Sequence, residues 1–283
     1  MREQKKTYPV RLLCYVMKVS RSAFYEWAGK SHQVIASALT ALEQEAVRLF
    51  IDHKKTLGSR RLKVKINELG FSVGRYKVRS LMKKLALFAR YPKRHKITTD
   101  SAHNHSIVPN LLAREFTVTQ REEVWTTDIT YVWTYEGWMY LAVVMDLYSR
   151  QIIGWAMAAH MKTALCVQAL QMAYWRRKPP KGLLHHSDRG SQYTRHQYRA
   201  HLQVMGVQAS MSGKGQCWDN APTERFFRSL KYEYLNYEIL KTRNDAKLGG
   251  LDYLAYYNSR RPHSLLAYFS PMEFERIPVI NLS

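Results

Sequence analysis

The sequence VWTTDITYVW at residues 124–133 decides the fold class. It is rich in Thr, Ile, Val, Tyr and Trp, which are enriched in β-strands, and Glu136-Gly137 supplies a turn directly after it. A near-continuous apolar run over residues 138–145 and a shorter segment over residues 152–157 follow. Because such short links join antiparallel neighbours, we expect a meander of three strands, with Asp128 inside the first.

Helical and strand patterns then alternate along the chain. We expect helices over residues 163–175, 192–205 and 220–234, and strands over residues 182–186 and 207–211. A meander followed by strand–helix–strand units predicts an α/β fold with a mixed five-stranded sheet and flanking helices.

The part of the chain before this core has the pattern of small all-α units. Two short helices within residues 9–27, the second capped by Ser20, predict a helix-turn-helix-like segment. Three further helices, separated by Gly58 and Gly70, predict a second such unit that is strongly basic.

These patterns set the expected domains. They are an N-terminal helix-turn-helix-like segment (1–35), a basic helical DNA-binding domain (36–91), a linker (92–120) and a catalytic core with a C-terminal helical extension (121–283).

Charge is distributed unevenly along the chain. The formal net charge is +22 and the pI is near 9.9, which indicates a polyanionic partner. Residues 1–100 hold 23 Lys and Arg against 7 Asp and Glu, whereas residues 101–283 hold 21 against 15. Most of the positive excess therefore precedes the core, as expected for a binding region ahead of a catalytic one.

Composition excludes several classes of protein. An apolar content of 46% with 23% charged residues is typical of a globular chain, neither disordered nor membrane-bound. Cys14, Cys166 and Cys217 are widely spaced and form no Cys-x-x-Cys pair, which favours reduced thiols over a disulfide frame or a zinc site. No signal peptide follows the basic start, so we expect a cytoplasmic protein that does not enter a membrane.

Three carboxylates lie in contexts typical of one metal site. Asp128 lies in the first expected strand, Asp188 follows the fourth, and Glu224 lies in the last helix, with 35 residues between it and Asp188. A chain this basic has little reason to gather carboxylates unless a cation holds them. Magnesium takes oxygen ligands, and two such ions about 3.5–4 Å apart can activate a nucleophile and stabilise a leaving oxygen on phosphorus. The pattern predicts a chain that cuts and joins DNA.

Basic residues near these motifs are the expected DNA contacts. Arg228 and Lys231 follow Glu224 on one helix face, although an ordinary Glu–Arg pair four residues apart would also explain the first of them. Lys214 lies in a loop whose glycines permit motion beside nucleic acid. In the basic helical domain the expected contacts are Arg60, Arg61, Arg75, Lys77 and Arg79.

Several motifs of the chain are specific in combination. They are GSRR (58–61), WTTDITY (125–131), MDLYSR (145–150), HSDRGSQY (186–193), GQCWDNAPTE (215–224) and YYNSRRPHS (256–264). Together they resemble one known family, the integrase-core transposases of insertion sequence three type, and within it the product of the second reading frame. The resemblance covers nearly the whole chain.

The resemblance implies an RNase H-like fold in which Asp128, Asp188 and Glu224 form an Asp-Asp-Glu triad that binds two Mg²⁺ or Mn²⁺ ions. It further implies that water releases a 3′-hydroxyl at the element's end, and that this hydroxyl attacks a phosphodiester without a covalent protein intermediate. The implied partners are double-stranded DNA of the element ends and target, further copies of the chain in a synaptic complex, and the upstream-frame protein. The implied location is the nucleoid of a bacterium.

Two other functions fit parts of the pattern. One is a DNA-binding regulator whose core is catalytically silent, and the other is a structure-selective nuclease on the same fold. The basic helical units and the YYNSRRPHS motif favour a transposase over the nuclease. The intact set of three carboxylates argues against a decayed core.

Overall fold

The computed structural model describes residues 8–29, 39–90 and 107–277, and the chain forms two compact units, residues 1–47 and 48–283. The first unit contains α1 (Val10–Val16) and α2 (Arg21–Gly29). The Ala23 N–H donates to Ser20 Oγ at 3.1 Å, so the expected cap of the second helix is confirmed. No helix in the described ranges is both long and apolar enough to cross a bilayer.

Three helices form where the basic pattern predicts them, namely α3 (Ala41–Asp52), α4 (Ser59–Glu68) and α5 (Arg75–Lys84). Gly58 and Gly74 cap α4 and α5 in extended backbone conformations. Leu62, Ile66 and Val78 are completely buried, so one stripe of α4 and one of α5 is apolar. The basic side chains of α5 lie outside this stripe.

The predicted mixed five-stranded sheet is present, with the order β3-β2-β1-β4-β5. The first three strands pair antiparallel, and β1–β4 and β4–β5 pair parallel. Only the first three residues of β1, Val124 to Thr126, pair with β4, so the rest of that edge has no strand beside it in the described structure. The strands are β1 (Val124–Thr134), β2 (Gly137–Asp146), β3 (Ile152–Ala158), β4 (Leu184–Ser187) and β5 (Gln208–Met211).

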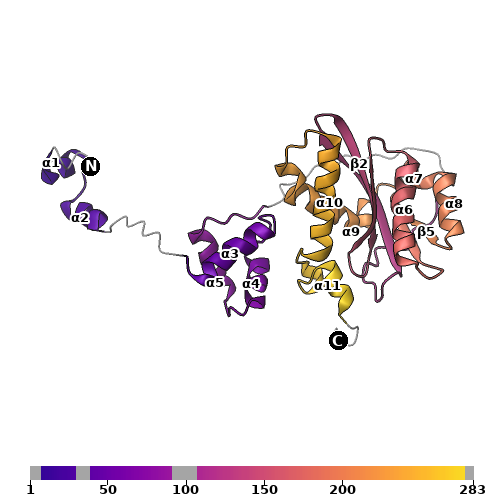
Figure 1. Cartoon of the computed structure of the whole chain (residues 1–283), viewed down its shortest axis with the longest axis horizontal. Helices are drawn as coiled ribbons and strands as arrows, with labels where there is room; N and C mark the ends of the chain where they lie inside the picture. Colours follow the sequence, from indigo (N-terminus) through magenta and orange to yellow (C-terminus); the bar gives the residue numbers. More distant parts are fainter. Residues whose placement is uncertain (1–7, 30–38, 91–106, 278–283) are drawn as a thin grey trace. The chain divides into compact units, whose positions relative to one another are not determined.

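Helices cover both faces of the sheet (Figure 1). On one face α6 (Thr163–Arg177) and α8 (His196–Val204) bury a core that includes Trp125 and Leu170. On the other face α9 (Ala221–Glu233) and α10 (Arg243–Ser259) bury a core that includes Phe226 and Tyr253. The chain ends with α11 (Pro271–Arg276), and η2 (Cys217–Asn220), η3 (Leu235–Tyr237) and η4 (Ser264–Leu266) are short 3₁₀ turns.

One predicted helix is wrong. The expected helix over residues 192–205 is two helices, α7 (Ser191–Thr194) and α8, because Arg195 between them has extended backbone angles (φ −64°, ψ 142°). Helical periodicity continues across Arg195, so the sequence pattern does not show the break. A separate constraint fixes Gly154, where an added Cβ would lie 2.2 Å from the Ala169 carbonyl oxygen.

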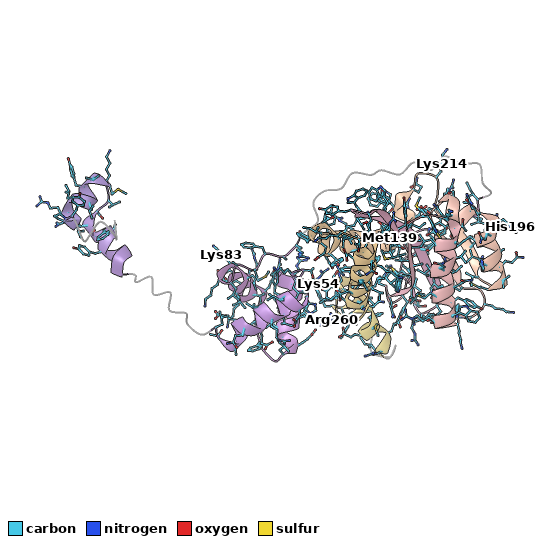
Figure 2. The ribbon with its side chains drawn as sticks, turned by 45° about the horizontal axis from the view of Figure 1, so that its top comes forward. Lys54, Lys83, Met139, His196, Lys214 and Arg260 are labelled. Carbon is cyan, nitrogen blue, oxygen red and sulfur yellow. The ribbon has the colours of Figure 1, made fainter. Side chains whose placement is uncertain are left out.

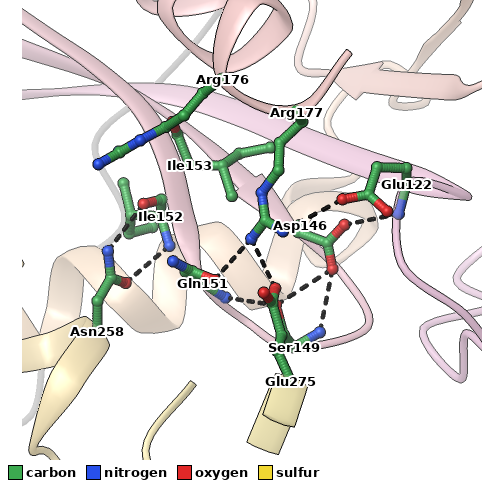
Figure 3. A network of polar contacts seen from close by, with 10 residues as sticks. All are labelled: Glu122, Asp146, Ser149, Gln151, Ile152, Ile153, Arg176, Arg177, Asn258 and Glu275. Carbon is green, nitrogen blue, oxygen red and sulfur yellow. Dashed lines mark hydrogen bonds and ion pairs between the residues drawn. The ribbon is translucent and has the colours of Figure 1, made fainter. Parts of the chain in front are cut away.

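A partly buried polar network surrounds Asp146 at the end of β2 (Figure 3). Arg177, at the end of α6, donates to Gln151 and Glu275 at 2.6 Å each and to Glu122 at 3.2 Å. Asp146 accepts the Glu122 N–H at 2.9 Å. These bonds join the segment just before β1, the end of β2, the β2–β3 turn, α6 and α11, and they give Asp146 a structural role.

A second network surrounds Glu233 at the end of α9. Arg261 donates to Glu233 at 2.6 and 2.7 Å, and the Tyr253 hydroxyl donates at 2.8 Å. Arg61 of α4 approaches the same carboxylate at 3.5 Å. Burial alone would raise the pKa of Glu233, but the charge of Arg261 and these hydrogen bonds hold it below its usual value.

Aromatic contacts extend this junction between residues 54–61 and α10. The Lys54 amino group and the Arg260 guanidinium each lie 5.8 Å from the centre of the Tyr256 ring, and both are labelled in Figure 2. The Tyr256 hydroxyl also lies 3.1 Å from Thr56 Oγ1. The contact between residues 54–56 and the end of α10 is therefore made by polar, charged and aromatic side chains.

We expect Glu233→Gln to lower the free energy of unfolding by about 3–5 kcal/mol, because the buried Arg261 guanidinium loses its counter-charge. Since the pKa of Glu233 is lowered in the folded chain, this stabilisation is present above the ordinary carboxyl pKa and is lost as pH falls through the lowered value. Urea denaturation at neutral and acidic pH measures both effects.

The matched control for this change is Glu238→Gln, since Glu238 is exposed. We expect the control to alter stability by no more than about 0.5 kcal/mol. A loss for Glu233→Gln that equals the control, or that stays constant as the pH falls, would contradict this account of the network.

Candidate active site

The sheet places two of the three carboxylates at the same level. Asp128 lies within β1 and Asp188 directly follows β4. Thr126 of β1 is level with His186 of β4, and each carboxylate comes two residues later on its own segment. Adjacent strands lie about 4.8 Å apart, so the parallel pairing of β1 with β4 brings these distant residues together.

The loop after β4 is shaped around Asp188. The Gly190 N–H donates to Asp188 Oδ1 at 2.9 Å, and a Cβ added to Gly190 would lie at the same distance from that oxygen. A side chain at position 190 would therefore crowd the carboxylate. Asp128 Oδ1 is held in a similar way by the Ile129 N–H, at 2.7 Å.

Two hydrogen bonds fasten the start of α9 to β1. The Thr223 hydroxyl donates to Thr126 Oγ1 at 2.7 Å, and the Asn220 side-chain amide donates to the Thr127 carbonyl oxygen at 3.0 Å. Glu224 is the next residue after Thr223, so these bonds hold its backbone beside the strand that carries Asp128. Sequence reasoning missed Thr126, Asn220 and Thr223 as positioning residues, although all three lie inside the two motifs.

The three carboxylates repel one another electrostatically. Burial, and then the charge of Asp188, raise the pKa of Asp128 well above its usual range, and Glu224 adds to the effect. Lys231 acts in the opposite direction on Asp128. The solvent-accessible area of the Glu224 side chain classes it as exposed, yet partial desolvation and the charge of Asp188 also raise its pKa. A cation placed among these carboxylates would stabilise their ionised forms and offset their mutual repulsion.

The donor chemistry fits a hard divalent cation, although the side chains do not enclose one as they stand. All three residues offer carboxylate oxygens, the ligands that magnesium prefers. Among the described residues, no three His, Cys, Asp or Glu side chains converge closely enough to hold a metal ion. The Glu224 side chain is exposed and lies on the first turn of α9. A change of its side-chain rotamer is therefore the smallest movement that would bring its carboxylate toward Asp128 and Asp188.

Neighbouring polar side chains shape the loops around the carboxylates. His186 lies between Ser210, at 2.9 Å, and Ser212, at 3.2 Å, and burial lowers its pKa to about 4. Asp219 accepts from the Gly213 N–H at 2.8 Å and from Arg114 at 2.6 Å. These contacts fix both ends of the loop that carries Lys214, and they give Asp219 a structural role.

The predicted DNA contacts fall into two regions of the chain. Arg60, Arg75, Lys77 and Arg79 are exposed on α4 and α5. Lys214 and Arg228 are exposed in the core, and Lys214 is labelled in Figure 2. Lys231 lies 5.0 Å from the centre of the Tyr131 ring. Arg61 differs from the others, because it forms an ion pair with Glu233.

Family models match most of the described chain. The integrase core domain matches at residues 118–217 and again, in a second model of the same description, at residues 205–271. An HTH-like domain matches at residues 38–95. The three matches agree with a mixed sheet and flanking helices preceded by a helical domain.

Curated relatives cover nearly the whole sequence. The chain is 40% identical over 263 residues to the insertion element IS600 uncharacterized 31 kDa protein of Shigella sonnei, covering 93% of this chain and 97% of that protein. It is 35% identical over 271 residues to transposase InsF for insertion sequence IS3A of Escherichia coli (strain K12), covering 95% and 94%.

A solved structure with a more remote likeness is the HTLV-2 integrase catalytic core domain in complex with magnesium. It has 14% sequence identity and a TM-score of 0.42, over 55% of this chain and 97% of that chain. The inference about the family therefore comes from the sequence relatives and the family models. On their evidence the chain belongs to the IS3 family of insertion-sequence transposases, with an integrase catalytic core and an HTH-like domain, and acts in transposition and DNA integration.

Proposed function

We propose that the chain cleaves DNA at the ends of its insertion element and joins those ends to target DNA, with Asp128, Asp188 and Glu224 as catalytic residues that hold two Mg²⁺ ions. The observation that supports this is the level placement of Asp128 and Asp188 on paired parallel segments, with the Glu224 backbone fastened to β1 beside them. Mn²⁺, which also takes carboxylate oxygens, is expected to substitute.

Magnesium bound at these oxygens supplies Lewis-acid stabilisation of the phosphate and activation of the attacking oxygen. In the first step a water oxygen bonds to phosphorus and the bond from phosphorus to the 3′ oxygen breaks, which leaves a 3′-hydroxyl on the element. In the second step this hydroxyl bonds to a target phosphorus, and a target 3′ oxygen leaves. The protein's contribution is to position both strands.

Cations on α9 neutralise phosphates next to the reacting group. Arg228 and Lys231 follow Glu224 by four and seven residues, which places all three on one helical face. Lys231 also acts electrostatically on Asp128. A phosphodiester at the carboxylates therefore lies within reach of two cations from the same helix.

The helical domain is proposed to bind double-stranded DNA of the element ends. The exposed Arg75, Lys77 and Arg79 on α5 form the basic surface expected of a recognition helix. Two element ends must meet for transposition, so we propose a homo-oligomer, with the upstream-frame protein as a further partner. We also propose that it works in the bacterial cytoplasm, at the nucleoid.

A DNA-binding regulator with a silent core is the second candidate. It shares the basic helical domain and the fold, and it differs only in whether the carboxylates act. Loss of a single carboxylate therefore separates the two functions.

We expect Asp128→Asn to abolish cleavage and joining of labelled element-end DNA in magnesium, while the variant still binds that DNA. We also expect magnesium at about a hundred times its dissociation constant to stabilise the unmodified chain by about 2.7 kcal/mol, and to stabilise the variant far less. Gel analysis of products and a thermal-shift titration measure the two effects.

The control for both measurements is Asp52→Asn, since Asp52 is exposed at the end of α3. It is expected to behave like the unmodified chain. Equal product from Asp128→Asn and the control would contradict the catalytic assignment. Binding by both, with product from neither, would favour the regulator.

We expect Arg228→Ala and Lys231→Ala to weaken binding by a similar factor on every DNA sequence, because each removes a contact to phosphate. Each change should also reduce the slope of log affinity against log salt by about one. Fluorescence anisotropy across a series of salt concentrations measures the slope. Arg121→Ala, an exposed cation before β1, is the control, and an unchanged slope in the α9 variants would exclude these contacts.

A further inference from the structure

Exposed aromatic rings gather on the β1–β2 hairpin. Tyr131, Trp133 and Trp138 are 46%, 55% and 46% exposed, and we call them the aromatic cluster. The Trp133 and Trp138 ring centres lie 4.8 Å apart and those of Tyr131 and Trp138 lie 5.5 Å apart, all in edge-to-face geometry. Large rings this exposed are unusual on a sheet whose other face is well packed.

The position of the cluster follows from the pairing of the strands. Trp133 is opposite Trp138 in the β1–β2 register, and Tyr131 lies two residues before Trp133, so all three side chains share one face. Because β4 pairs only with the first three residues of β1, this stretch of β1 borders an open edge in the described structure. Edge-to-face contacts leave part of each ring face open to a further partner.

Cations flank the cluster on two sides. The Lys231 amino group lies 5.0 Å from the centre of the Tyr131 ring. At the hairpin turn the Arg243 guanidinium approaches Gly137, where an added Cβ would lie 3.2 Å from Nη2, and the Arg243 backbone N–H donates to the exposed Glu136 carboxylate at 2.8 Å. Aromatic rings flanked by cations are complementary to a polyanion that also presents flat rings, which is the chemistry of nucleic acid.

The cluster and the Asp128 carboxylate lie on opposite faces of the sheet. Tyr131 and Trp133 follow Asp128 by three and five residues, and side chains alternate faces along a strand. The two faces meet at the edge of β1 that β4 leaves open. Lys231 connects the two regions, because it acts electrostatically on Asp128 and contacts the Tyr131 ring.

We propose that the aromatic cluster stacks on unpaired bases of the DNA strand where that strand passes from the carboxylates around the open edge of β1. A paired duplex hides the faces of its bases, whereas an unpaired segment exposes them to aromatic rings. The inference rests on the proposed function for the presence of DNA at the carboxylates. It adds that this surface selects strands opened near the reacting bond.

The test compares single-stranded and duplex DNA on the full-length chain in EDTA. The probes are a labelled oligothymidylate of about twelve nucleotides and a paired duplex of equal length, with affinity measured by fluorescence anisotropy. We expect Trp133→Leu to weaken single-strand binding by about fivefold to a hundredfold and duplex binding by less than about twofold. Trp133→Phe, which keeps a ring, should retain most of the single-strand affinity.

The matched control is Trp175→Leu, which removes an exposed tryptophan from α6, and its binding should be unchanged. A circular-dichroism melt checks the fold of each variant. If Trp133→Leu does not fold, then Tyr131→Leu replaces it, with the same expected selectivity.

Three results would overturn the inference. They are an unchanged single-strand affinity, an equal loss on both DNAs, and a change in oligomeric state with unchanged DNA affinity, which would make the cluster an interface between copies. Since the assay contains no magnesium, failure of the catalytic proposal leaves this measurement unaffected.

Discussion

The parallel pairing of β1 with β4 is the constraint on which the site depends. These strands come from opposite sides of a long insertion that contains β2, β3 and α6, and their register decides which residues are level. A shift by one residue would turn Asp128 to the other face of the sheet. The bond between Thr223 and Thr126 then adds Glu224 to the same strand, so β1 organises all three carboxylates.

The carboxylates of the core have two kinds of surroundings. Glu233 is enclosed by Arg261, Arg61 and Tyr253, and its pKa is lowered, as expected for a carboxylate that stabilises structure. Asp128 and Glu224 have raised pKa values, because their nearest strong influences are burial and another carboxylate. Such unfavourable arrangements gather at functional sites, where a ligand supplies the missing charge.

Much of the fold could be predicted from local sequence. The apolar run of β2 and the β-branched and aromatic residues of β1 specify strands without reference to the rest of the chain. The break at Arg195 was not predictable in this way, because no proline or glycine marks it. The pairing of Arg61 with Glu233 was also hidden, since it joins residues far apart in sequence, and in the sequence Arg61 belongs to the same basic run as Arg60.

In the candidate site, too, the sequence predicts the residues within motifs but not the contacts that depend on tertiary packing. Each carboxylate could be proposed because it lies within a motif of its own. The residues that position them could not, because the bonds of Thr223 and Asn220 to β1 depend on the packing of α9 against the sheet. The aromatic cluster was equally hidden, since tyrosines and tryptophans in a strand usually fill a core, and the exposure of these three becomes visible only in the folded chain.

The most direct measurement of the central claim is a crystal structure of the full chain soaked with manganese, with anomalous scattering used to locate the ion. The account predicts anomalous density bonded to oxygens of Asp128 and Asp188, with the Glu224 side chain turned toward it. Carboxylates that remain apart in manganese, with the ion absent or bound elsewhere, would contradict the account.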